Sequence, residues 1–226
     1  MALRHYKLTG GTVSQRGSVQ VAFRIFDLIY PLKTRGIGFL SSLLPKRVRV
    51  ELPLVDVAGT FSFYAHDKYW SKMVIEGRRY EPEVSNYLSR YIGKKVLFID
   101  GGANNGYWTI YAAKQFGPGT DVWAIEANPA KYLELDHTIQ LNGLDVTAMN
   151  RALSDESGDL VDLDVSNGHA SASILLRENS RKSVKTQTIA IDVMLEEARR
   201  VAEFSYEAVI LKLDVEGVEI NAIINN

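Results

Sequence analysis

The chain has no cysteine among its 226 residues, and this absence excludes several kinds of chemistry. A protein without thiols forms no disulfide, has no cysteine nucleophile and cannot bind zinc through cysteine. No uncharged apolar run reaches the roughly 20 residues that a membrane-spanning helix requires. The formal net charge is only −1, so no overall positive field attracts nucleic acid. We therefore expect a cytoplasmic protein that does not bind nucleic acid.

The charge is unevenly distributed along the chain. Residues 1–50 contain nine lysines and arginines and a single acidic residue, Asp27, so this segment carries a net charge of +8 (9 − 1). Between residues 18 and 44 apolar side chains are interleaved with basic ones, and two short helices broken near Pro31 and Gly36 are predicted. Such an arm can pack on a main domain, contact a second copy or lie on an anionic membrane, and we keep a peripheral membrane contact as an expectation.

Three segments follow from the residue patterns. Residues 1–46 form the basic, apolar helical arm. Residues 47–80 form a small β-rich extension, because "RVRVELPLVDV" alternates between apolar and polar residues and a second short strand pattern, "TFSFYA", follows Gly59. Residues 81–226 form the main domain, which opens with a helix over residues 81–92.

From residue 95 onward, strand patterns alternate with helix patterns. The continuous apolar run "KVLFID" is typical of a strand buried on both faces, and "NGYWTIYAAKQF" predicts the helix that follows it. "DLVDLDVS" is expected to pair with residues 184–191. Three further core strands are predicted in "DVWAIE", "DVTAMNRALS" and "EAVILKLDVEG". The alternation predicts an α/β fold with a Rossmann-like, doubly wound and mainly parallel sheet.

The turn "IDGGANNG" joins the first of these strands to its helix. In a doubly wound sheet, ligands bind beyond the carboxyl ends of the strands. A P-loop is excluded, because Tyr107 and Trp108 follow Gly106 where lysine and serine or threonine are needed. A dinucleotide fingerprint fits at Gly101 and Gly106, but Ala103 stands at the middle position, where a methyl group opposes the approach of a pyrophosphate. NAD(P) therefore remains an alternative ligand.

The same turn also fits an acidic-x-Gly-x-Gly-x-Gly pattern, whose ligand is S-adenosylmethionine. The four positions of the pattern are Asp100, Gly102, Asn104 and Gly106. Asparagine is the residue that best replaces glycine at positive φ. Asp100 and the exposed amides of the turn can bind the amino-acid end of this ligand, directly or through water. A tight turn without a ligand is the other interpretation.

The second predicted strand ends at Glu126, 26 residues after Asp100 (126 − 100). A carboxylate at this point can accept hydrogen bonds from both hydroxyls of a ribose, although a surface glutamate is also possible there. Asn128 follows as a further candidate, and its main predicted role is to cap the helix that begins at Pro129.

The third and fourth strand ends supply the remaining candidates. In "NRALSD", Arg151, Ala152 and Leu153 are positioned to flank an adenine. In "LKLDVEGVE", Asp214 and Glu216 bring carboxylates to the end of an apolar strand, which is unfavourable without a functional reason. Two carboxylates one residue apart do not by themselves predict a metal site.

Over roughly residues 80–220 the chain resembles the FkbM-type S-adenosylmethionine-dependent methyltransferases, which have the class I methyltransferase fold. The segments that carry the resemblance are, in order, "VLFIDGGANNGYWTIYAAKQFGPG", "VWAIEANP", "LNGL", "RALSDESGDL" and "VILKLDVEGVE". The resemblance implies O-methylation of a hydroxyl on a sugar, a glycan or a small natural product. The class I core has seven strands, so we expect the chain, which ends at Asn226, to lack the C-terminal ones.

The resemblance also implies roles for individual residues. Asp100, Gly102 and Gly106 would surround the methionine portion of the cofactor, Glu126 would bind its ribose, and Asp214 would lie near the reacting centre. In such a reaction a substrate hydroxyl attacks the sulfonium methyl in line, assisted by a general base.

The candidate bases are Asp214 and Glu216, with His169 in the loop "SNGHASAS" as a third. Two other functions remain open at this point. One is an NAD(P)-dependent oxidoreductase, and the other is a non-catalytic truncated module that binds a membrane or a partner through residues 1–50.

Overall fold

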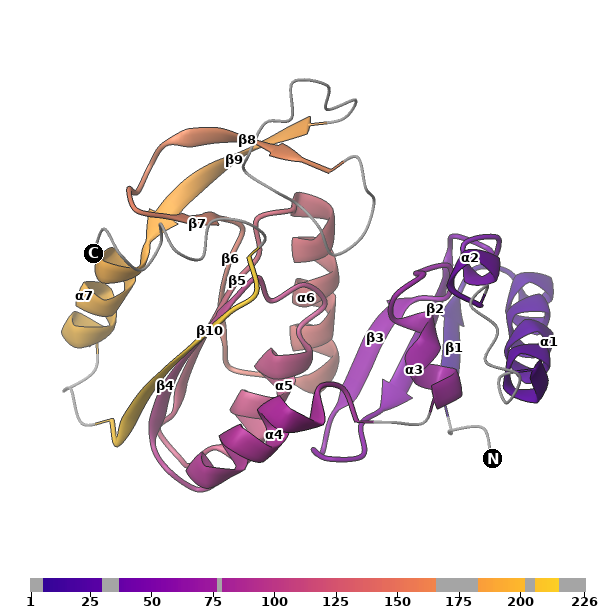
Figure 1. Ribbon diagram of the computed structural model, residues 1–226, viewed down its shortest axis with the longest axis horizontal. Helices are drawn as coiled ribbons and strands as arrows, with labels where there is room; N and C mark the ends of the chain where they lie inside the picture. Colours follow the sequence, from indigo (N-terminus) through magenta and orange to yellow (C-terminus); the bar gives the residue numbers. More distant parts are fainter. Residues whose placement is uncertain (1–5, 30–36, 77–78, 166–182, 202–205, 216–226) are drawn as a thin grey trace. The chain divides into compact units, whose positions relative to one another are not determined.

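A computed structural model describes residues 6–29, 37–76, 79–165, 183–201 and 206–215 (Figure 1). The chain divides into two compact units, Met1–Tyr87 and Leu88–Asn226. The arm and the β-rich extension, expected as separate segments, fall together in the first unit, because a strand of the arm pairs with a strand of the extension. Within the described residues, no helix is both long and apolar enough to cross a bilayer.

The first unit is built on an antiparallel sheet in the order β1-β2-β3. Its strands are β1 (Lys7–Gly10), β2 (Val48–Pro53) and β3 (Thr60–Tyr64), and its helices include α1 (Val13–Ile29), α2 (Ile37–Ser41) and α3 (Ser71–Glu76). The alternation in β2 buries Val48, Val50 and Leu52, as a strand with one core face requires. Phe61 of β3 packs edge-on against Trp70, with 4.7 Å between the ring centroids.

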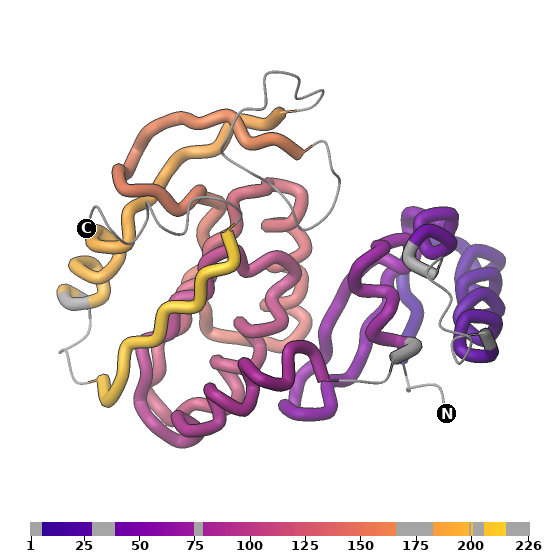
Figure 2. Tube along the Cα trace, viewed as in Figure 1, coloured from indigo at the N-terminus to yellow at the C-terminus, as the bar shows by residue number. Residues whose placement is uncertain are grey.

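The second unit contains the predicted parallel sheet, in the order β10-β4-β5-β6. Its strands are β4 (Val96–Gly101), β5 (Asp121–Ile125), β6 (Thr147–Met149) and β10 (Ala208–Leu213). From β4 the chain moves outward through β5 to β6, and it then returns to β10 on the other side of β4, as the yellow trace in Figure 2 shows. The strand order therefore reverses between β4 and β10, which is where open α/β sheets bind their ligands.

Helices cover both faces of this sheet. Figure 1 shows α5 (Tyr107–Gln115) and α6 (Pro129–Asn142) on one face and α7 (Ile191–Val201) on the other. The short helix α4 (Pro82–Leu88) and a 3₁₀ turn precede β4. On the α7 side, Leu97 and Ile99 of β4 pack in one core cluster with Met194. Phe98, between them, packs on Phe116 on the other side. Because β4 is buried on both faces, its sequence is an apolar run without alternation.

A second small sheet has the order β7-β9-β8. Its strands are β7 (Ala152–Ser154), β8 (Leu160–Asp164) and β9 (Ser183–Ala190). The predicted pairing of "DLVDLDVS" with residues 184–191 is confirmed, because β8 and β9 are antiparallel neighbours. The third core strand predicted within "DVTAMNRALS" is β6, and the same segment also contains β7, which belongs to the smaller sheet.

Helix α7 begins at Ile191. Asp192 lies inside the first turn of α7, where its carboxylate accepts a hydrogen bond from the N–H of Val193.

Candidate functional site at the carboxyl edge of the parallel sheet

The turn between β4 and α5 has three left-handed positions. They are Gly102 (φ 71°), Asn104 (φ 51°) and Gly106 (φ 87°). A Cβ atom on Gly102 would lie 2.1 Å from the carbonyl oxygen of Asp214, and one on Gly106 would lie 2.8 Å from a methyl of Leu135. The two glycines are therefore required both by their φ and by the close approach of β10 and α6. Asn104 has the positive φ expected for an asparagine that replaces glycine.

Asp100 lies at the end of β4 and is fully buried. Its Oδ2 accepts a hydrogen bond of 2.7 Å from the hydroxyl of Thr109, on α5. Its Oδ1 forms an ion pair with the ammonium of Lys212, 3.1 Å away. The carboxylate is thus engaged inside the protein, where it links α5 to β10. Its predicted contact with the amino-acid end of a cofactor stays a prediction.

Lys212, in β10, was not identified from the sequence. Its strand position is directly opposite Asp100 in the parallel register. Its ammonium also donates to the carbonyl oxygens of Gly102 (3.2 Å) and Gly101 (3.4 Å), and it lies 3.9 Å from the carboxylate of Asp214. Lys212 therefore stabilises the glycine turn by donating to two of its carbonyl oxygens. The sequence does contain one signal for it, a single charge inside the apolar run "AVILKL". An unpaired charge in a buried strand is unfavourable, so a lysine at this position indicates a buried partner of opposite charge.

Glu126 follows β5 and is only 8% exposed. One carboxylate oxygen accepts the N–H of Asn104 in the glycine turn, and the other accepts the N–H of Asn128, each at 2.8 Å. Burial raises the pKa of Glu126, while the two N–H groups and the ammonium groups of Lys131 and Lys212 act in the opposite direction. The carboxylate thus joins the ends of β4 and β5 and lies in a largely dehydrated environment.

Two asparagines shape the end of β5. Asn128 caps α6 as predicted, because its side-chain oxygen accepts the N–H of Ala130 (3.0 Å) and Pro129 follows it. Asn150 was not identified from the sequence. Its side-chain NH₂ group donates to the carbonyl oxygens of Glu126 (2.7 Å) and Ala127 (3.1 Å), so it fixes the backbone that carries Glu126. An asparagine after a short strand signals only a turn, so no local pattern distinguished it.

The residues expected near an adenine lie in or beside β7. Ala152 and Leu153 are buried, and Leu153 belongs to the core cluster between the sheet and α7. Its methyl would lie 2.5 Å from a Cβ on Gly101. The guanidinium of Arg151 donates to the carbonyl oxygen of Asn150 (2.9 Å). The side chain of Leu153 thus packs against the start of the glycine turn, and its contact with an adenine stays a prediction.

Asp214 stands at the exit of β10, at the point where the strand order reverses. Its backbone N–H donates to the carbonyl oxygen of Gly101 (3.0 Å), while its carboxylate is exposed. The other two candidate bases, Glu216 and His169, lie outside the described residues. No group of three possible metal ligands lies together in the part of the chain that the structure describes.

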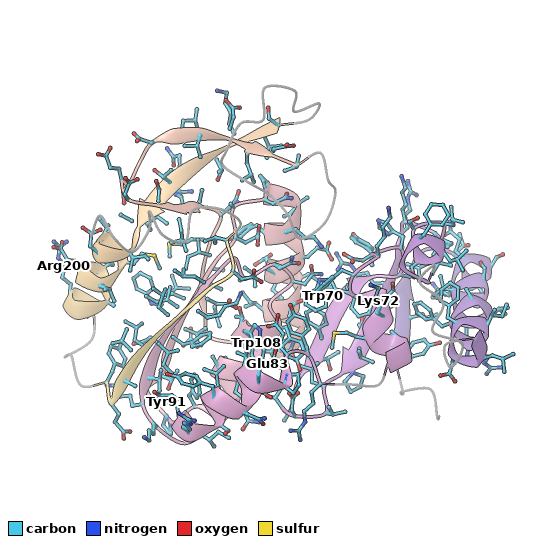
Figure 3. All side chains as sticks on the ribbon, viewed as in Figure 1. Trp70, Lys72, Glu83, Tyr91, Trp108 and Arg200 are labelled. Atoms are coloured by element: carbon cyan, nitrogen blue, oxygen red, sulfur yellow. The ribbon has the colours of Figure 1, made fainter. Side chains whose placement is uncertain are left out.

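Aromatic and small side chains beside the turn belong to the core. Trp108, labelled in Figure 3, is buried at the start of α5. It packs edge-on against Tyr107, with 5.1 Å between the ring centroids. Ala103 packs with Leu135 of α6. The methyl of Ala103 therefore points into the core, so the argument that it would obstruct a pyrophosphate is not supported by the structure. The choice between the two nucleoside ligands needs independent evidence.

Comparison with known proteins bears on the family of the chain. The family model described as "Methyltransferase FkbM domain" matches residues 100–226. Among curated proteins, none matches the chain. The family match covers more than half of the chain and begins at Asp100, so it includes the glycine turn, Glu126, Lys212 and Asp214. The chain belongs to the FkbM methyltransferase family.

Proposed function

We propose that the protein binds S-adenosylmethionine at the carboxyl edge of β4 and β5 and transfers its methyl group to a hydroxyl of a sugar, a glycan or a small natural product. The observation that carries the proposal is the carboxylate of Glu126, which the N–H groups of Asn104 and Asn128 hold at this edge. The membership in a methyltransferase family supports the cofactor, and the resemblance of the motifs supports a hydroxyl acceptor.

The residues present fit this cofactor. A carboxylate has about four acceptor sites, and the two backbone N–H groups use only two of those of Glu126. The remaining sites can accept the two hydroxyls of a ribose. The low-dielectric surroundings that raise the pKa of Glu126 also strengthen each hydrogen bond that it accepts. The left-handed glycine turn beside it carries no side chain at Gly102 or Gly106, while the N–H groups of Gly102, Ala103 and Gly106 donate to carbonyl oxygens of the chain.

Bound S-adenosylmethionine supplies an electrophilic methyl group on a sulfonium. In this proposal the carboxylate of Asp214, which is exposed beside the glycine turn, accepts the proton of the attacking hydroxyl, with Glu216 as the alternative base. Lys212 holds the carbonyl groups of Gly101 and Gly102 and so fixes the position of Asp214 relative to the turn. The main contribution of the chain is alignment of the reacting groups.

Isothermal titration calorimetry with three ligands tests the proposal: S-adenosylmethionine, S-adenosylhomocysteine and NADH. We expect binding of the first two and not of NADH. The Asp214→Asn variant should bind S-adenosylmethionine within about twofold of the wild type but lose methyl transfer, because a general base contributes about 10²- to 10⁴-fold to the rate. Binding of NADH without binding of either sulfur nucleoside would overturn the proposal.

A further inference from the structure

Helix α1 of the first unit has one apolar face that packs in the core. Val19, Phe23 and Phe26 are buried there. Phe23 packs edge-on against Tyr6, with 5.6 Å between the ring centroids. This face accounts for the docking of α1 on its own unit, as an amphipathic helix requires.

The same helix carries a second apolar stripe that the core does not use. Val21, Ile25 and Leu28 are 58%, 51% and 78% exposed, and we call them the outer stripe. Their spacing of four and then three residues places them within one narrow sector of the helix. The buried residues of α1 lie on the opposite side, because successive residues turn by about 100°. The outer stripe is thus a distinct exposed surface.

Basic residues accompany this surface. Arg24 is exposed on the helix next to the outer stripe, and Lys46 and Arg47 are exposed before β2 in the same unit. Phe39 of α2 and Leu43, which follows α2, add exposed apolar side chains. The sequence of residues 1–50 carries nine basic residues against Asp27 alone. Residues 1–50 therefore combine exposed apolar side chains with a strong excess of positive charge.

We propose that the outer stripe of α1 binds the surface of an anionic lipid bilayer, with the helix lying in the plane of the interface. Stable peripheral binding needs two contributions, apolar insertion and attraction to anionic headgroups, and this unit supplies both. A second copy of the chain is the less suitable partner, because it would bring together two segments, residues 1–50 of each copy, that each carry a net charge of +8. The proposal does not depend on methyl transfer.

Flotation of the full chain with lipid vesicles tests this surface. We expect binding to phosphatidylcholine vesicles that contain about one third phosphatidylglycerol, and binding about tenfold weaker to phosphatidylcholine alone. The triple variant Val21→Ser/Ile25→Ser/Leu28→Ser should lose about tenfold or more of the binding. A matched control, Leu133→Ser/Leu160→Ser, replaces two exposed leucines of the second unit and should bind as the wild type does.

A separate double variant tests the electrostatic contribution to membrane binding. Lys46→Gln/Arg47→Gln should weaken binding to the anionic vesicles and reduce its dependence on salt, because screening acts on the electrostatic part alone. The control Lys185→Gln, at an exposed lysine of β9, should change neither the binding to anionic vesicles nor its dependence on salt. Equal binding of the wild type to neutral and anionic vesicles would contradict the electrostatic half of the proposal.

A single-site probe covers the case in which the triple variant does not fold. Because the chain has no cysteine, Leu28→Cys gives one attachment site for an environment-sensitive fluorophore, and Leu133→Cys gives the control site. We expect a blue shift on anionic vesicles at position 28 only. The absence of a shift at position 28 would overturn the proposal, and so would wild-type binding by the triple variant. A dimer in light scattering that the triple variant abolishes would also overturn it, in favour of a second copy of the chain.

Discussion

The ends of β4 and β5 each carry a buried carboxylate, and the protein holds the two in different ways. Asp100 is bound by a lysine ammonium and a threonine hydroxyl, whereas Glu126 is bound by two backbone N–H groups. An ion pair neutralises its carboxylate within the fold. Backbone amides orient a carboxylate but leave it acceptor sites for a ligand. Burial alone therefore does not identify a ligand-binding acid, and the identity of its partners is more informative.

The largest expected effect concerns the end of β4. Lys212→Met should lower the free energy of unfolding by about 3 to 5 kcal/mol, because it leaves the buried charge of Asp100 without its partner. Lys185→Met, which breaks an exposed pair with Asp162, should change it by no more than about 0.5 kcal/mol. Denaturant titration measures both. Similar small losses for the two variants would mean that Lys212 is not the partner that stabilises Asp100.

The glycine turn gives the next largest effect. Gly102→Ala should lower stability by about 3 kcal/mol, because a left-handed φ disfavours alanine and its Cβ would overlap the carbonyl oxygen of Asp214. Gly143→Ala is the matched control: its φ is also positive, 56°, but nothing lies within 4 Å of the new Cβ. It should lose only about 1 to 2 kcal/mol. Equal losses of stability for the two variants in thermal or denaturant unfolding would show that the backbone at Asp214 does not closely approach Gly102.

Replacing Glu126, at the end of β5, should lower cofactor affinity as well as stability, because two N–H groups of the chain also donate to its carboxylate. Glu126→Gln should weaken the binding of S-adenosylmethionine by about 1 to 3 kcal/mol, because buried polar groups lose a charged acceptor. Asp100→Asn should instead act mainly on unfolding, because its carboxylate contacts groups of the chain. Calorimetric titration and denaturant unfolding of both variants separate the two roles. The reverse pattern would end the distinction between the two carboxylates.

The raised pKa of Glu126 predicts a dependence on pH. Its folded pKa lies above its ordinary value of 4.5, so the stability that this group contributes is present below the unfolded pKa and is lost as pH rises through the folded pKa. Cofactor binding should change in the opposite sense, because the ionised carboxylate is the better acceptor. Affinity for S-adenosylmethionine should therefore increase as pH rises above 4.5. The same titration on Glu126→Gln should lack this increase.

The smallest effect is expected at the cap of α6. Asn128→Ala should lower stability by about 1 kcal/mol, because the N–H of Ala130 loses its acceptor. Asn128→Ser keeps a capping oxygen and should recover most of the loss. Thermal unfolding distinguishes the two variants. A loss of cofactor affinity without a loss of stability would show instead that the side chain of Asn128 contacts the ligand.

The features of the site that could be predicted are those that depend on neighbouring residues. The positive φ of Asn104 follows from its own side chain and from the pattern of glycines around it. The cap at Asn128 follows from Pro129 and the helical pattern behind it. The engagement of Glu126 by the glycine turn could not be predicted, because Asn104 and Glu126 follow different strands and are brought together by the pairing of β4 with β5.

The sequence alone determined the alternation of strands and helices, the left-handed turn after β4 and the position of Glu126 after β5. Each depends on propensities within a few residues. Only the tertiary structure decided that Lys212 pairs with Asp100 and that α1 keeps one apolar face buried and a second exposed. Those outcomes depend on strand register and on what covers a surface, which are set by contacts between residues far apart in the chain.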